Sequence, residues 1–312
     1  MYETIRRVCG RQITFLHHDR LHFDEGTAIW LIERKATREW LNAHCPGDRV
    51  MIGCGDGEFD DHTTATKVRT GTDSSATLVA QSLGLRKHPA YRQLFNYVVA
   101  HDQQGVTNPF DAGGIVKMLH SRFPSAQVLE WIYMVLDAEY TKQQEYLQAP
   151  AIVKEAKVRM VTIGKRQLKV VAVSSGNRQV IKAFRTPSIS GAVCVQAFPT
   201  GHIRVFIDRF SGVDMRVVAR EIRKTEIAAR SLDVQIDDDL LTAEGWAGLE
   251  DPKVWYFVHG MMLNGSNTEP DADPTKLTLE QVTDIVADNL ALKSLDADVV
   301  SNDQPVEGEA TG

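Results

Sequence analysis

The stretch ITFLHHDRLHFDEGTAIWLIERK, residues 13–35, decides the fold of the first half of the chain. Its apolar start, residues 13–17, predicts a strand. After Asp24, apolar residues recur at helical spacing and predict a helix. Asp24 and Glu25 fall where the positive end of a helix dipole favours negative charge. A strand that leads through a polar turn into a helix is typical of α/β folds, whose ligands bind at the carboxyl ends of the strands.

The same alternation continues to about residue 150. A strand is predicted at 49–54, and helices at 74–84, 90–102 and 126–147. The helix at 74–84 is expected to be capped by Ser74 or Ser75 and to end at Gly84. The domain boundary is expected within or just after the long helix. We therefore predict an N-terminal α/β domain, residues 1–150, with a mostly parallel sheet.

A second set of strands and helices follows the boundary. Strands are predicted at 168–175, 191–199, 202–210 and 253–260, and helices near 177–185, 213–230 and 276–290. This order predicts a smaller C-terminal α/β domain over residues 151–290. Arg216 and Arg220 most simply form a solvated helix face. The last residues, 291–312, are acidic, small and polar, and predict a disordered tail.

Charge and cysteine content limit the classes of function. The net charge of −6 argues against a broad basic surface for non-specific duplex binding. It does not exclude an enzyme for short phosphate substrates, because bound cations can supply local positive charge. The four cysteines form no CxxC pair, so we expect reduced thiols in a cytoplasmic protein. The start, MYETIRRVCGRQ, lacks the apolar core of a signal peptide, and no apolar run approaches eighteen residues, so we expect no membrane partner.

Imidazoles and carboxylates gather after two of the predicted strands. The candidate metal ligands are His17, His18, His22, Asp24, Asp56, Asp60, Asp61, His62 and Asp102. Such a set suits Mn²⁺ or Mg²⁺, as one or two ions, whereas the lack of clustered thiolates disfavours structural zinc. The simpler interpretation is a helix start at Asp24 and Glu25 and a solvated turn around 57–62. For any single residue this simpler interpretation is the more common one.

Several blocks of the sequence resemble one family. LHHDRLHFDE is similar to the THNGTFHCDE block of the melanocyte-proliferating-gene-like proteins, which are related to the DHH phosphoesterases. FDDHTTATKVRTGTDSSATLVAQSLG resembles that family's FDHH motif and its TKLSSAGLVYKHFG block, and NYVVAHDQQGV resembles VDAIDNGV. In the second half, CVQAFP, EGWAGL and YFVHGMMLNGSNT resemble RVQAVP, PEEWRGL and VFVHASGFIGGNKT. The blocks keep the same order over most of residues 13–290.

The resemblance implies a DHH-like first domain, a substrate-binding second domain, and a divalent-metal phosphoesterase whose relatives act as RNA exonucleases. By position, His17, His22 and Asp24 match the first metal motif, although His18 fits the spacing of the wider superfamily. Asp102 matches the late acidic ligand. The residues assigned by resemblance to catalysis are Asp61 and His62, and those assigned to substrate binding are Ser75, His101, His259, Asn264, Gly265 and Ser266.

Three departures from the family pattern keep other functions open. Asp61 replaces the first histidine of FDHH, and Asp56 is the nearest counterpart of the family's VDVGG aspartate. Asn267 stands where the family has a lysine, which removes a positive phosphate contact. We expect hydrolysis of RNA or of short oligonucleotides by metal-activated water. The alternatives are a small-molecule phosphodiesterase or pyrophosphatase, and a catalytically degenerate metal- or nucleotide-binding module. A homodimer is one open alternative for the oligomeric state.

Overall fold

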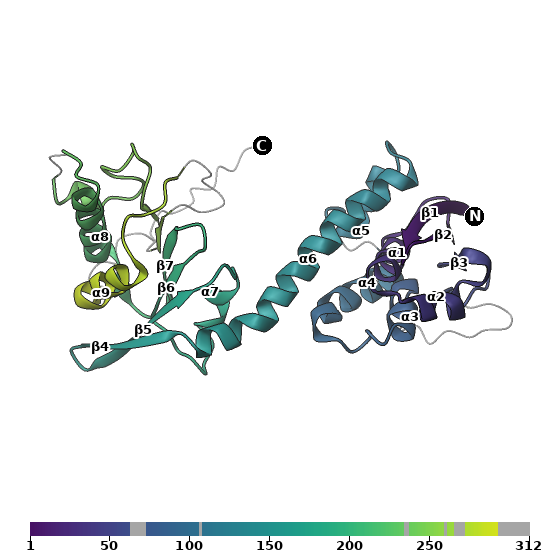
Figure 1. Ribbon diagram of the computed structural model, residues 1–312, viewed down its shortest axis with the longest axis horizontal. Helices are drawn as coiled ribbons and strands as arrows, with labels where there is room; N and C mark the ends of the chain where they lie inside the picture. The colour runs from purple at the N-terminus through teal and green to yellow at the C-terminus, as the bar shows by residue number, and fades with distance from the viewer. Residues whose placement is uncertain (63–72, 106–107, 234–236, 259–260, 265–271, 293–312) are drawn as a thin grey trace, which may run out of the picture. The chain divides into compact units, whose positions relative to one another are not determined.

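The computed structural model describes residues 1–62, 73–105, 108–233, 237–258, 261–264 and 272–292 (Figure 1). The chain divides into two compact units, Met1–Leu147 and Gln148–Gly312. Among the described residues, no helix is both long enough and apolar enough to cross a membrane.

The sheet of the first unit is mixed, with the strand order β1-β2-β3. The strands are β1 (Tyr2–Val8), β2 (Arg11–His17) and β3 (Arg49–Met51). Because β1 runs antiparallel to β2 and only β3 is parallel to it, the prediction of a mostly parallel sheet is wrong. Strand β1 was not predicted, since only Thr4 and Val8 of its seven residues are buried and its apolar pattern is correspondingly weak. Cys9 and Gly10, both at positive φ, close the β1–β2 hairpin.

Six helices complete the first unit, and the last of them continues beyond its end at Leu147. They are α1 (Phe23–Lys35), α2 (Arg38–His44), α3 (Ser75–Ser82), α4 (Arg92–Gln104), α5 (Ala112–Leu119) and α6 (Ser125–Lys154), and the short 3₁₀ turns are Pro46–Asp48 and Pro89–Tyr91. The helix predicted at 74–84 is confirmed, and Ser74 is its cap, with a side chain that accepts from the Thr77 N–H.

Helix α1 lies at the centre of the first unit. Ten of its thirteen residues are buried, and it packs against the sheet and against α3, α4 and α5. A helix buried on nearly all sides is held firmly by its neighbours. The turn that precedes it, and the first residues of the helix itself, are therefore supported by the core of the unit.

The sheet of the second unit is also mixed, with the order β4-β5-β6-β7-β10-β9. The strands are β4 (Lys157–Ile163), β5 (Arg166–Ser174), β6 (Val193–Ala197), β7 (Ile203–Ile207), β9 (Tyr256–Val258) and β10 (Met261–Leu263). Only β5 and β6 form a parallel pair among the described strands of this sheet. The four predicted strands of this half are present, whereas β4 and β10 were not predicted.

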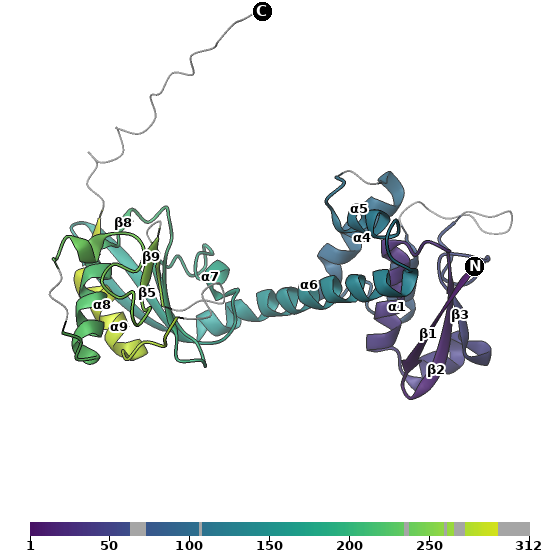
Figure 2. The ribbon, with the colours of Figure 1, turned by 90° about the horizontal axis from the view of Figure 1, so that it is seen from above.

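Helices cover both faces of this sheet. They are α7 (Val180–Ala183), α8 (Arg216–Ala229) and α9 (Leu279–Asn289), with a 3₁₀ turn at Leu240–Thr242. α8 and α9 lie side by side (Figure 2) and pack on one face, and α7 and the end of α6 pack on the other. A further pair, β8 (Val213–Asp214) and β11 (Ala291–Leu292), shows that the first two residues of the predicted tail belong to the fold. The rest of that tail, 293–312, lies outside the described residues.

Candidate metal centre

The polar turns that follow β2 and β3 lie together at the carboxyl ends of this parallel strand pair. One turn contains residues 18–22 and leads into α1, and the other contains residues 53–62. The first turn of α3 and the last turn of α4 border the same place, because both helices pack against α1 and against each other. The position agrees with the general rule that parallel strands present ligand-binding side chains at their carboxyl ends.

Three carboxylates converge at this place. One oxygen each of Asp24, Asp61 and Asp102 lies within 4.8 Å of the others. Burial raises the pKa of Asp24, and the charges of Glu25, Asp102 and Asp61 raise it further against a hydrogen bond from Ser75. Burial, followed by the neighbouring Asp61 carboxylate, raises the pKa of Asp102 to about 7. Among the described residues, no lysine or arginine forms an ion pair with any of the three. A divalent cation would supply the missing positive charge.

A buried carboxylate fixes the orientation of one imidazole beside this cluster. The Oε1 atom of Glu25 accepts from His18 Nδ1–H at 2.7 Å and from the His18 backbone N–H at 3.2 Å. Its Oε2 atom accepts from the His22 backbone N–H at 2.7 Å. A carboxylate that holds Nδ1–H determines the tautomer and leaves Nε2 as a lone-pair donor for a metal. Glu25 thus acts both as a helix cap and as the support of His18.

A second carboxylate holds another imidazole in the same way. Asp60 Oδ1 accepts from His62 Nδ1–H at 2.8 Å and from the His62 backbone N–H at 3.0 Å. Burial alone would raise the pKa of Asp60, but these hydrogen bonds, together with one from the Asp56 N–H, lower it. The His18 ring lies 5.6 Å from the His62 ring and 5.3 Å from the His22 ring, measured between centroids. Three imidazoles therefore stand in a row beside the carboxylates.

The structure distinguishes His17 from His18. The His17 side chain is fully buried, its Nδ1–H donates to the His18 carbonyl oxygen at 2.7 Å, and its Nε2 accepts from the Thr4 hydroxyl at 2.8 Å. Both ring nitrogens are thus used within the protein. Metal ligation by His17 would break one of these buried hydrogen bonds. His18 is the histidine that lies with the other candidate ligands.

The structure places the remaining predicted residues differently. Asp60 forms a second group with Asp61 and His62, whose ligand atoms lie within 4.8 Å of one another, whereas the exposed Asp56 contributes only its backbone N–H to Asp60. The Ser75 hydroxyl donates to Asp61 Oδ1 at 2.6 Å. Asn264 is buried in the second unit. Finally, His259, Gly265 and Ser266 lie outside the described residues.

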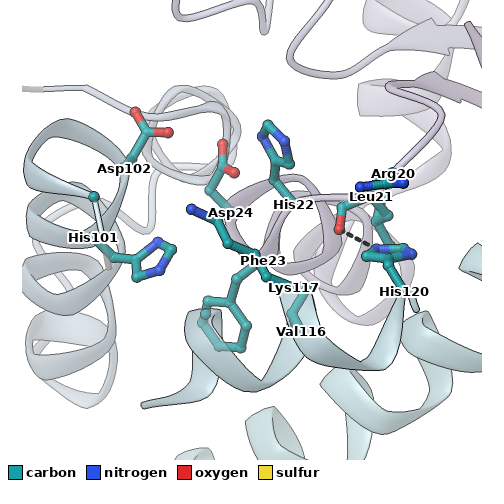
Figure 3. A pocket seen from close by; sticks show the side chains of 12 residues that line it. Arg20, Leu21, His22, Phe23, Asp24, His101, Asp102, Val116, Lys117 and His120 are labelled. Carbon is teal, nitrogen blue, oxygen red and sulfur yellow. Dashed lines mark hydrogen bonds between the residues drawn. The ribbon is translucent and has the colours of Figure 1, made fainter. Parts of the chain in front are cut away.

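A pocket of about 370 Å³ adjoins the carboxylates (Figure 3). Asp24 lies in it between His22 and Asp102, and the pocket wall also contains His101, Lys117 and Arg20. Burial lowers the pKa of His101, and among the described residues its Nε2 atom has no hydrogen-bond partner. The pocket thus combines acidic groups with two cations and one imidazole ring.

Sequence reasoning missed the glycines that make room for these side chains. At Gly53, which has a φ of +66°, an added Cβ would lie 2.7 Å from Glu25 Oε1 and 3.0 Å from Ser75 Oγ. At Gly113 it would lie 2.0 Å from His101 Nε2. The close approach of Glu25 to Gly53 depends on the tertiary fold.

Replacing Gly53 by alanine is expected to destabilise the protein by about 2–4 kcal/mol and to weaken Mn²⁺ binding, because the methyl group displaces Glu25 from His18. Gly84→Ala is the matched control, since Gly84 has a φ of +71° and no atom within 4 Å of an added Cβ. The control should cost about 1 kcal/mol and leave Mn²⁺ affinity unchanged. Urea unfolding and Mn²⁺ titration measure both effects. Equal losses in the two variants would contradict the close contact.

No protein-family model, no curated protein and no solved structure matches this chain. The resemblance to the melanocyte-proliferating-gene-like family therefore stays a prediction. Within the described residues, the structure itself contributes groups of carboxylates and imidazoles that could hold a metal ion.

Proposed function

We propose that the first unit is a divalent-metal-dependent phosphoesterase that hydrolyses phosphodiester bonds at the end of an RNA chain or in a short oligonucleotide. The observation that supports this most is the convergence of Asp24, Asp61 and Asp102 beside two imidazoles held by buried carboxylates. Carboxylate clusters that accept divalent cations are a common basis of phosphodiester hydrolysis.

The donor set fits Mn²⁺ well and Mg²⁺ less well, because it mixes carboxylate oxygens with imidazole nitrogens. Asp24, Asp61 and Asp102 would hold a first ion, and His18 and His22 stand next to them for a second. When bound, such an ion supplies Lewis acidity toward a phosphoryl oxygen and lowers the pKa of water. Ser75 holds the Asp61 carboxylate in position from the first turn of α3.

The pocket residues would bind the substrate. Lys117 and Arg20 bring positive charge to the wall beside the acidic cluster, where they can contact phosphate oxygens. The His101 ring forms part of the pocket wall, with its Nε2 buried 3.9 Å from Asp111 Oδ1. The volume of about 370 Å³ lies near the lower end of the ~300–1,000 Å³ range of small-ligand pockets. A single nucleotide unit therefore suits the pocket better than an internal stretch of a long chain.

Hydrolysis of bis-p-nitrophenyl phosphate, a dinucleotide and a long single-stranded RNA tests the proposal with purified full-length protein. We expect activity that requires Mn²⁺, is lost in EDTA, and falls about 10–100-fold in Asp61→Asn. Asp56→Asn is the matched control, because Asp56 lies in the same turn but its exposed side chain is outside the carboxylate cluster. It should retain wild-type rates.

Three outcomes would change the assignment. Tight Mn²⁺ binding without hydrolysis of any substrate would indicate a degenerate binding module. A strong preference for the dinucleotide, which the small pocket favours, would indicate a small-molecule phosphodiesterase in place of an exonuclease. Equal losses in Asp61→Asn and Asp56→Asn would show that the carboxylate cluster is not the metal site.

A further inference from the structure

Buried polar atoms without partners gather at one end of the sheet in the second unit. Among the described residues of this unit, all such side-chain atoms belong to Gln179, Gln196, Arg204 and Asn264. β5 and β6, the parallel pair, end here, and β7 begins here. Gln196 is directly opposite Arg204 in the β6–β7 register, so their side chains share one face of the sheet, whereas Asn264, one residue after the Leu263 partner of Arg204, lies on the other face at the same end. Native proteins leave few buried polar groups unpaired, so such a cluster calls for a ligand.

Arg204 provides a positive charge in a fixed place. Its guanidinium carbon lies 4.8 Å from the centre of the Phe198 ring and 5.1 Å from that of Phe206, so two aromatic rings restrain the side chain. No ion pair to an acidic residue is present for Arg204 or for the nearby Arg178 in the part of the chain that the structure describes. Burial, and then the charge of Arg178, lowers the pKa of Arg204. Two neighbouring arginines without acidic partners favour an anionic ligand.

The side-chain amides of this cluster contribute hydrogen-bond acceptors. Gln196 Nε2 donates to the carbonyl oxygens of Ser175 and Asn177, each at 2.8 Å, which fixes its Oε1 as the unpaired atom. Gln179 Oε1 is likewise unpaired among the described residues. Asn264 is fully buried, and neither its donor nor its acceptor has a partner in that part of the chain. An amide oxygen needs a hydrogen from the ligand, which a phosphate dianion lacks and a hydroxyl group offers.

We propose that the second unit has a binding site for a phosphorylated polyol, of the sugar-phosphate class, at this end of its sheet. Arg204 and Arg178 bind the phosphate oxygens. The amide oxygens of Gln196 and Gln179 accept from the hydroxyl groups. The site lies wholly in the second unit and does not depend on the phosphoesterase activity proposed for the first.

Isothermal titration calorimetry on the full chain in EDTA, with ribose 5-phosphate as the probe, tests this site. We expect ribose 5-phosphate to bind at least about tenfold more tightly than inorganic phosphate, and ribose not to bind detectably. Arg204→Met should weaken binding at least about tenfold. The matched control is Arg209→Met, because Arg209 also lies over a phenylalanine, Phe210 at 4.6 Å, but follows the other end of β7. It should leave the affinity within about twofold of wild type.

Two more variants distinguish a loss of ligand binding from a loss of folding and from an effect of the first unit. Arg178 is exposed, so Arg178→Met tests the same charge without disturbing the core and should weaken binding about threefold or more. Asp24→Asn should keep full affinity, since the site is independent of the first unit. Absence of binding by ribose 5-phosphate, equal affinity for inorganic phosphate, or equal behaviour of Arg204→Met and Arg209→Met would each overturn the proposal.

Discussion

Replacing Asp24 by asparagine is expected to abolish Mn²⁺ binding and phosphodiester hydrolysis, and at the same time to raise the melting temperature of the metal-free protein. Asp24 is only 6 % exposed and stands next to the carboxylates of Glu25, Asp102 and Asp61. Without a cation, its negative charge is buried among like charges, which opposes folding. Asparagine keeps the size of the side chain and removes the charge, so the same change that removes the ligand relieves the repulsion.

The pH dependence of this effect has a definite sign. The pKa of Asp24 in the folded protein is raised above its ordinary value of 3.8. Below that value the carboxyl is protonated in both the folded and the unfolded chain, and the substitution should have little effect. As the pH rises, the unfolded chain ionises first, so the folded state loses stability relative to it. The stabilisation by Asp24→Asn should therefore grow as the pH rises from about 4 toward 7. The pKa of the neighbouring Asp102 is also raised, to about 7.

Thermal melts from pH 4 to 8, in EDTA or in Mn²⁺, measure both halves of this prediction. Wild-type protein should gain roughly 5–10 °C from Mn²⁺ at about 100 times its Kd, and Asp24→Asn should gain nothing. Asp19→Asn is the control, because Asp19 is exposed in the same turn. A lower melting temperature of metal-free Asp24→Asn, or a retained response to Mn²⁺, would mean that Asp24 has a structural role only.

The alternation of side chains along β2 distinguishes His17 from His18, although the spacing of the metal motif does not. Side chains alternate along a strand, so His17 shares a face with Ile13 and Phe15, and all three are fully buried. His18 is the first residue after β2, so its side chain does not have to follow this alternation. The period of the strand therefore favours His18 as the exposed ligand, whereas the family resemblance left both open.

Other parts of the candidate site depend on contacts that sequence patterns do not encode. Asp102 is 78 residues after Asp24, and only the packing of α4 against α1 brings the two carboxylates together. The role of Glu25 was predicted in part, because a carboxylate three residues after a helix cap is a known capping pattern. Its hydrogen bond to His18 requires the preceding turn to fold back over α1. Element types were thus more predictable than the partners of their side chains.

Sheet topology was the weakest prediction for the same physical reason. Alternation of strands and helices suggested parallel pairing, but the β1–β2 hairpin forms through a two-residue turn whose left-handed backbone has no strong sequence signature at Cys9. Strand β4 has an exposed Val158 and Met160, so it lacks the buried face that identifies a strand. Local patterns predict a strand only where one of its faces is buried.

Replacing Arg223 by methionine is expected to cost the second unit about 3–5 kcal/mol of unfolding free energy. The side chain is fully buried in α8, a helix whose Arg216 and Arg220 were interpreted as a solvated face. Its guanidinium donates only to carbonyl oxygens: to Leu241 and Ala243 at 2.8 Å each, to Gly245 at 2.5 Å, and to Trp255 at 3.1 Å and 3.3 Å. These bonds tie the chain from 241 to 255 onto the helix. Methionine fills similar space but removes the guanidinium donors from the carbonyl oxygens of the buried Leu241 and Trp255, whereas the Gly245 carbonyl still accepts from the Phe257 N–H at 2.9 Å.

Urea unfolding of the full chain, followed by the fluorescence of tryptophan, compares this variant with Arg216→Met on the same helix. Arg216 is 60 % exposed and pairs with Asp214, so its loss should cost less than about 1 kcal/mol. Arg223→Lys should fail to rescue, because one ammonium group cannot reach carbonyl oxygens on four residues. Equal midpoints for Arg223→Met and Arg216→Met would show that the 241–255 segment holds its conformation without the guanidinium.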